Sequence, residues 1–168
     1  LADLQARLHA AGEVFNALHV HANRACLALN LREPEQALAL IEEVEPAAIK
    51  AGFLRLATLM HRERARAERE CGHRAAALAA FDEALRALAG SNEHTEGVLD
   101  RAATALEAGR HDEARRDLDA AAASLTLAGG SATPFERGYQ RALEQAYATL
   151  TGEVAINVES DMQPTGNV

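Results

Sequence analysis

The sequence predicts an all-α protein built from repeated helix pairs, and two observations support this prediction. The apolar residues are mostly Ala and Leu, which are the best helix formers, while Val, Ile, Thr and Tyr are sparse before residue 150, which argues against a large sheet. Glycines recur at intervals of 40, 38 and 39 residues, a spacing typical of a helical solenoid. These glycines are Gly12, Gly52, Gly90 and Gly129.

Alanines and a turn follow the glycines at nearly constant distances. A first alanine comes 12 or 13 residues after the glycine, a turn follows, and in three units a second alanine comes 24 or 25 residues after the glycine. The first alanines are Ala25, Ala65, Ala102 and Ala142, and the second alanines are Ala37, Ala77 and Ala114. The alternative is an ordinary Ala-rich helical bundle with chance matches, but the agreement of glycine spacing, turn position and apolar residues favours repeats.

Three units and a single terminal helix are expected in order. The units cover residues 12–51, 52–89 and 90–128. Their helices are expected over residues 13–30, 34–51, 53–70, 73–89, 93–108 and 111–128. In the second unit, Gly72 suits the left-handed conformation that ends a helix, and Phe81 lies one turn after Ala77 on the face that packs on the preceding helix.

The two ends of the chain depart from this pattern. A Thr-Pro pair supplies an N-cap and a favoured first helical residue, so the terminal helix is expected over residues 133–150. This helix closes a repeat domain over residues 12–151, and residues 1–11 are expected to be the end of a preceding helix or a cap. Residues 152–168 are expected to form an extended tail or linker, with a short strand as the alternative.

The order of small residue, turn glycine, alanine, large apolar residue and alanine resembles that of tetratricopeptide (TPR) repeats. These residues are Ala65, Gly72, Ala77, Phe81 and Ala84 in unit two, and Ala102, Gly109, Ala114, Leu118 and Ala121 in unit three. Unit one has Arg32 where the turn glycine is expected. The period is longer than the usual 34 residues and resembles the repeats of bacterial maltose-regulator-type transcription activators and signalling proteins. The resemblance implies a TPR-like α-solenoid, a right-handed superhelix of antiparallel helix pairs.

The composition argues against several classes of function. A formal net charge of −8 disfavours direct nucleic-acid contact, and no apolar stretch is long enough to span a membrane. Cys26 and Cys71 form neither a disulfide framework nor a zinc spacing, so a reducing, cytoplasmic location is expected. The histidines have no metal-ligand spacing, and neither a phosphate loop nor a nucleophile elbow is present. We therefore expect no metal, no cofactor and no enzymatic activity.

The resemblance implies that the first helix of each pair lines a concave groove where a partner binds. Arg62, Arg66 and Arg69 recur at i, i+4 and i+7, so they form one stripe of a helix. Guanidinium groups bind carboxylates through paired hydrogen bonds, which suggests an acidic protein or peptide partner. The other residues expected to contact it are His19, Leu59, Leu99, Leu106 and Tyr139. The alternative is a solvated arginine face paired with Glu63, Glu68 and Glu70.

These observations favour a protein- or ligand-binding module, which we expect to belong to a larger bacterial signalling or transcription regulator. Two alternatives stay open at this point. The array is a structural module that self-associates, for example as a homodimer, through the apolar ends of the repeats. In the second alternative, the array is a small-molecule sensor whose groove closes over an effector that stabilises the folded state.

Overall fold

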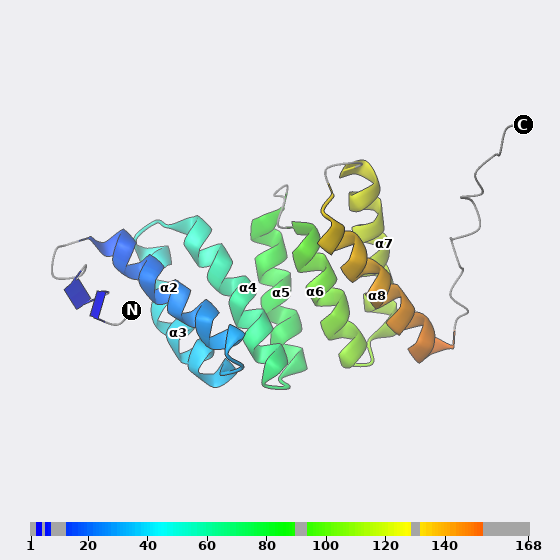
Figure 1. Cartoon of the computed structure of the whole chain (residues 1–168), viewed down its shortest axis with the longest axis horizontal. Coiled ribbons are helices and arrows are strands. Elements are labelled where there is room, and N and C mark those ends of the chain that lie inside the picture. The colour runs from blue at the N-terminus through cyan, green and yellow to red at the C-terminus, as the bar shows by residue number, and fades with distance from the viewer. Residues whose placement is uncertain (1–2, 5, 8–12, 90–93, 129–131, 153–168) are drawn as a thin grey trace, which may run out of the picture.

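The fold is a succession of α-helices joined by short turns, as the computed structural model in Figure 1 shows. The structure describes residues 3–4, 6–7, 13–89, 94–128 and 132–152. From residue 13 onward its helices are α2 (Val14–Asn30), α3 (Pro34–Lys50), α4 (Leu54–Glu70), α5 (Arg74–Leu88), α6 (His94–Glu107), α7 (His111–Ala128) and α8 (Pro134–Thr151). The described residues include no strand, so the all-α prediction is confirmed, and each of these helices begins and ends within one residue of its predicted range.

Some of the sequence predictions concern residues outside the described part of the chain. They are Gly12, Gly90 and Gly129, most of the 1–11 segment, and all but the first residue of the 152–168 tail. Gly52, the second glycine of that series, lies in the turn between α3 and α4 with a φ of 77°.

The helices form an open row in which each one packs on the next. The first helices of the pairs, α2, α4, α6 and α8, also contact one another in succession, and we call them the A helices. The second helices, α3, α5 and α7, are the B helices. Within the described residues α2 makes no contact with α6 or α8, and Figure 1 shows the helices following one another along the long axis of the molecule. The apolar core is accordingly divided, with one large cluster across α2, α3 and α4 and another across α5 to α8.

The alanines that mark the helix pairs lie where the helices meet. Six of them have no exposed surface, namely Ala25, Ala37, Ala65, Ala77, Ala102 and Ala114. The large apolar residues that follow them, Ile41, Phe81 and Leu118, are also fully buried. Ala142 is exposed, because no further helix follows α8 among the described residues. Leu143 and Tyr147 instead hold α8 against the core.

The turn inside each pair has the same backbone geometry. Gly72 and Gly109 have φ values of 82° and 70°, the left-handed conformation that a side chain disfavours. Arg32 occupies the equivalent place in the first turn, with a φ of 61°. The residue after each of these bonds back to the helix, for example His73 N–H to the Glu68 carbonyl at 2.8 Å and Glu33 N–H to the Ala28 carbonyl at 2.9 Å. The first turn is thus built like the others although it lacks the glycine.

Arginines tie neighbouring pairs together. Arg64 on α4 donates to Glu45 on α3 at 2.8 Å, and Arg101 on α6 donates to Asp82 on α5 at 2.7 Å. Each of these arginines directly precedes a buried alanine of its A helix and reaches the B helix of the preceding pair. The ion pairs therefore fix the stacking of one pair on the next.

Candidate functional site

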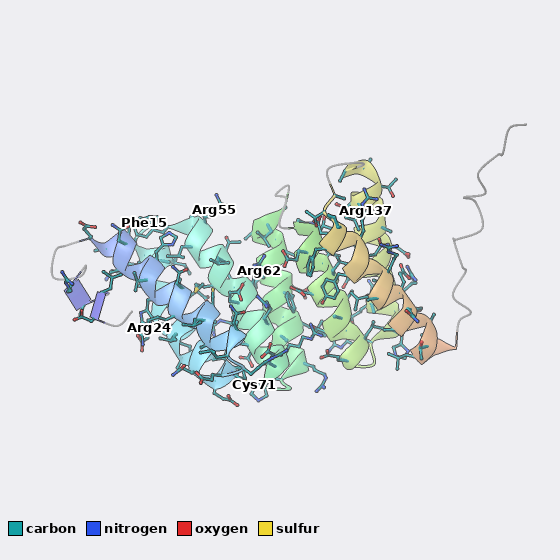
Figure 2. The ribbon with its side chains drawn as sticks, in the orientation of Figure 1. Phe15, Arg24, Arg55, Arg62, Cys71 and Arg137 are labelled. Carbon is teal, nitrogen blue, oxygen red and sulfur yellow. The ribbon has the colours of Figure 1, made fainter. Side chains whose placement is uncertain are left out.

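A cavity of about 420 Å³ opens across the A helices α4, α6 and α8. Its lining contains side chains of both charges together with two aromatic rings, namely Arg32, Arg66, Arg69, Glu70, Glu96, Asp100, Glu107, Phe135 and Tyr139. We call this cavity the groove. Arg66, Arg69 and Tyr139 were expected from the sequence to line a binding surface, and the structure brings these three together. Figure 2 shows Arg62, the other member of the arginine series, on α4 in the middle of the row.

Each of the helices α4, α6 and α8 contributes a different kind of side chain to the groove. The arginine stripe lies on α4 and consists of Arg62, Arg66 and Arg69, of which Arg66 and Arg69 line the groove. The carboxylate stripe lies on α6 and consists of Glu96, Asp100 and Glu107, whose spacing of four and seven residues places them on one helix face. The aromatic pair lies on α8 and consists of Phe135 and Tyr139, which are also four residues apart. A basic, an acidic and an aromatic stripe thus lie on three neighbouring helices, in that order.

The arginine and carboxylate stripes are paired across the two helices. Arg69 donates to the carboxylate of Glu107 through Nε, at 3.0 Å, and through Nη2. Burial lowers the pKa of Arg69, but its hydrogen bonds and charge contact with Glu107 outweigh this effect and raise the pKa above its ordinary value. Nη1 of Arg62 lies 3.7 Å from the carboxylate of Glu96. Carboxylates of α6 thus attract both arginines. Burial lowers the pKa of Arg62, while the charge of Glu63 on α4 acts more strongly than that of Glu96 to raise this pKa.

A buried glutamate neutralises the remaining part of the arginine stripe. Glu63 is only 2% exposed and accepts hydrogen bonds from Arg62 at 3.3 Å and from Arg66 at 2.9 Å. The alternative interpretation of the sequence was that the stripe is paired with Glu63, Glu68 and Glu70. Of these three, Glu63 pairs with the arginines, whereas Glu68 contacts His73 and Glu70 accepts a hydrogen bond from Arg32.

Asp100 and Tyr139 connect the carboxylate stripe to the aromatic pair. The hydroxyl of Tyr139 donates a hydrogen bond of 3.0 Å to Asp100. Burial raises the pKa of Asp100, although this hydrogen bond and the charges of Arg66, Arg69 and Arg62 act to lower it. Burial and the negative charge of Asp100 raise the pKa of Tyr139 to about 12, so the hydroxyl remains a hydrogen-bond donor at neutral pH.

The aromatic pair gives the groove an apolar wall that faces solvent. The rings of Phe135 and Tyr139 are 5.8 Å apart and inclined by 41°. Phe135 is 65% exposed and is one of several large apolar side chains that face solvent, Leu54 and Leu127 among them. The N-terminus of α8 is fixed by a capping box between Thr133 and Glu136, which holds Phe135 in the first turn.

The structure places the other predicted contact residues away from the groove. Leu99 is fully buried and Leu106 is 7% exposed, and both belong to the core across α5 to α8. They offer no apolar surface to a partner, so this expectation is corrected. Leu59 packs half-buried against the core of α2 to α4. His19 is half-buried against the ring of Phe15, at 4.4 Å, and neither of these two residues lines the groove.

Sequence reasoning missed three lining residues that helical spacing could have found, namely Asp100, Glu107 and Phe135. Asp100 lies four residues after Glu96 and seven before Glu107, so the three share one face of α6. Phe135 lies four residues before Tyr139 and therefore on the same face of α8. Arg32 could not be found in this way, because it reaches the groove from the turn between α2 and α3. Glu70 is the last residue of α4 and joins the lining through its hydrogen bond with Arg32.

Among the described residues there is neither a metal-ion site nor a membrane-spanning helix. No group of three or more His, Cys, Asp or Glu side chains among them is arranged to hold a metal ion. No helix in the same part of the chain is long and apolar enough to cross a membrane.

Comparison of the chain with protein-family models, curated proteins and solved structures gave no match.

Proposed function

We propose that the chain is a protein-binding module that holds an extended peptide segment of its partner in the groove. The row of helix pairs would then be a TPR-like, right-handed solenoid within a bacterial signalling or transcription regulator. The recurring left-handed turns, the buried alanines and the successive contacts between A helices support the solenoid. A solenoid binds through the extended face that one set of its helices lines.

The observation that favours peptide binding most is the groove itself. Three helices from different pairs place charged and aromatic side chains around one cavity. Its volume of about 420 Å³ lies in the range of ordinary ligand sites. An exposed aromatic side chain beside hydrogen-bonding groups is typical of the residues that contribute most to protein interfaces. Phe135, supported by Tyr139, has this arrangement.

Selection from a random peptide library tests this proposal. Short peptides displayed on phage would be selected on the full chain, and the enriched peptides would be labelled with fluorescein and titrated by fluorescence anisotropy. We expect Phe135→Ala to weaken binding about tenfold or more, because it removes the exposed wall of the groove. Leu150→Ala is the matched control, since it truncates an exposed side chain of α8 that does not line the groove. Equal affinity of the two variants, or no enrichment at all, would contradict the proposal.

The free face of α8 favours self-association as the second candidate function. Ala142 is exposed, whereas its counterparts Ala25, Ala65 and Ala102 are each covered by a B helix. A second copy that covered this face would produce a dimer. Sedimentation at several concentrations tests this candidate: a dimer that Ala142→Glu disrupts would support it, and a monomer at all concentrations would contradict it.

A further inference from the structure

The arginines of α4 are already paired with carboxylates of the protein, and this disfavours the binding of an acidic ligand to them. Each arginine of the stripe is already bonded to a carboxylate of the protein: Arg62 and Arg66 to Glu63, and Arg69 to Glu107. Arg32, which is also part of the lining, donates to Glu70 at 3.2 Å. A ligand carboxylate would have to displace one of these intramolecular partners, and the displaced carboxylate would then need a new partner.

The lining has an excess of negative charge instead. Four carboxylates line the groove against three arginines. Glu96 has a half-exposed side chain, and its ion pair within the described residues is the 3.7 Å contact with Arg62. Asp100 accepts its hydrogen bond from a neutral hydroxyl, that of Tyr139. The charges of Arg66, Arg69 and Arg62 act on Asp100, but no arginine in the described part of the chain donates a hydrogen bond to Asp100 or Glu96. A cation that entered between α6 and α8 would therefore find hydrogen-bond acceptors on both carboxylates.

The aromatic pair lies beside these same carboxylates. Tyr139 bonds directly to Asp100, and Phe135 lines the same cavity as Glu96. The face of an aromatic ring attracts a cation, and a guanidinium or ammonium group also bonds strongly to a carboxylate. Rings on one side and carboxylates on the other are the two elements that a basic side chain requires.

We propose that the groove anchors its peptide by a basic side chain, Lys or Arg, seated between Glu96 and Asp100 of α6 and Phe135 and Tyr139 of α8. This inference rests on the proposed peptide-binding function and specifies the chemistry of its ligand. It differs from the sequence expectation of an acidic partner held by the arginine stripe, which becomes an outcome of the test.

Double-mutant cycles with the phage-selected peptides test this anchor. In each peptide every Lys and Arg would be replaced in turn by norleucine, and every Asp and Glu by its amide. We expect one basic residue whose replacement lowers affinity about tenfold or more. Glu96→Gln with Asp100→Asn should cause a similar loss with the original peptide and little further loss with the norleucine peptide. Glu42→Gln, at an exposed position of α3 outside the groove, should change nothing.

The outcomes separate the two proposals. Should the double variant lose its fold, Glu96→Gln alone, at a half-exposed position, gives the same comparison. Affinity that depends on an acidic peptide residue and falls with Arg66→Met would overturn the basic anchor while leaving peptide binding intact. Affinity that no charge replacement alters would also overturn it. If no peptide is enriched, the proposed function fails and the anchor fails with it.

Discussion

Tyr139 on α8 donates a hydrogen bond to Asp100 on α6, 39 residues earlier in the chain. Two other contacts at the groove span nearly the same distance, since Arg69 and Glu107, and likewise Arg32 and Glu70, are 38 residues apart. These spacings equal one repeat period, so each contact joins the first helix of one pair to a residue of the adjacent pair. The groove is therefore a product of the repetition, because its side chains meet only when successive A helices lie side by side.

Asp100→Asn should stabilise the protein at neutral pH. Burial raises the pKa of Asp100 in the folded state, so the folded protein takes up this proton more readily than the unfolded chain does. The ionised carboxylate thus lowers stability above the folded-state pKa, and this cost disappears as the pH falls through that pKa. Urea unfolding should give the Asp100→Asn variant a higher free energy of unfolding than the original protein at pH 7. This difference should decrease as the pH is lowered to 4.

The Asn side chain still offers an oxygen to Tyr139, so the hydrogen bond remains in this variant. Glu42→Gln on the exposed surface of α3 is the control and should unfold like the original protein at each pH. A less stable Asp100→Asn variant at pH 7 would mean that attraction to Arg62, Arg66 and Arg69 exceeds the cost of burial.

Arg101→Met should destabilise the protein by about 2 kcal/mol, because it removes charge-assisted hydrogen bonds and leaves a largely buried carboxylate without its cation. Arg101 joins three helices through Asp82 on α5 and Asp117 on α7. The pKa of Asp117 is raised by burial even in the presence of this arginine. Denaturant unfolding measures the loss. Arg116→Met on the exposed side of α7 is the control, and an equal effect of both variants would rule out this role of Arg101.

The left-handed turns predict opposite effects of two substitutions. Arg32→Gly should raise stability by about 0.5–1 kcal/mol, since glycine adopts a positive φ without steric cost and the lost ion pair with Glu70 is exposed. Gly109→Ala should lower stability by about 1 kcal/mol through backbone strain alone, because an added Cβ would meet no atom within 4 Å. Thermal unfolding of both variants measures these changes. A destabilised Arg32→Gly variant would show that the Arg32–Glu70 contact outweighs the strain.

Replacement by leucine at two equivalent alanines should change the stability of the protein by very different amounts. Ala102→Leu should cost roughly 1–3 kcal/mol, because Ala102 is fully buried where two helices meet. Ala142→Leu should change stability by less than about 0.5 kcal/mol, since the equivalent face of α8 is exposed. Chemical denaturation of both variants provides the comparison. A similar loss in the two would show that another part of the chain covers α8.

Much of the fold could be predicted because its signals are local. Alanine and leucine favour helix, and Gly72 and Gly109 end helices in a conformation that few other residues adopt readily. Leu99 and Leu106 were misplaced because α6 packs against α4, α5, α7 and α8, so most of its surface is core. Glu63 could be predicted as a partner of Arg62 and Arg66 because it lies within three residues of both, whereas Glu107 could not, since it lies one full period away from Arg69.

The most direct test of the peptide-binding groove is to map a phage-selected peptide onto the isotope-labelled chain by NMR. We predict that backbone amide shifts change on α4, α6 and α8 around Arg66, Asp100 and Tyr139, while the exposed surface of α3 around Glu42 stays constant. Shift changes confined to the exposed surfaces of the B helices would contradict a binding site on the A helices.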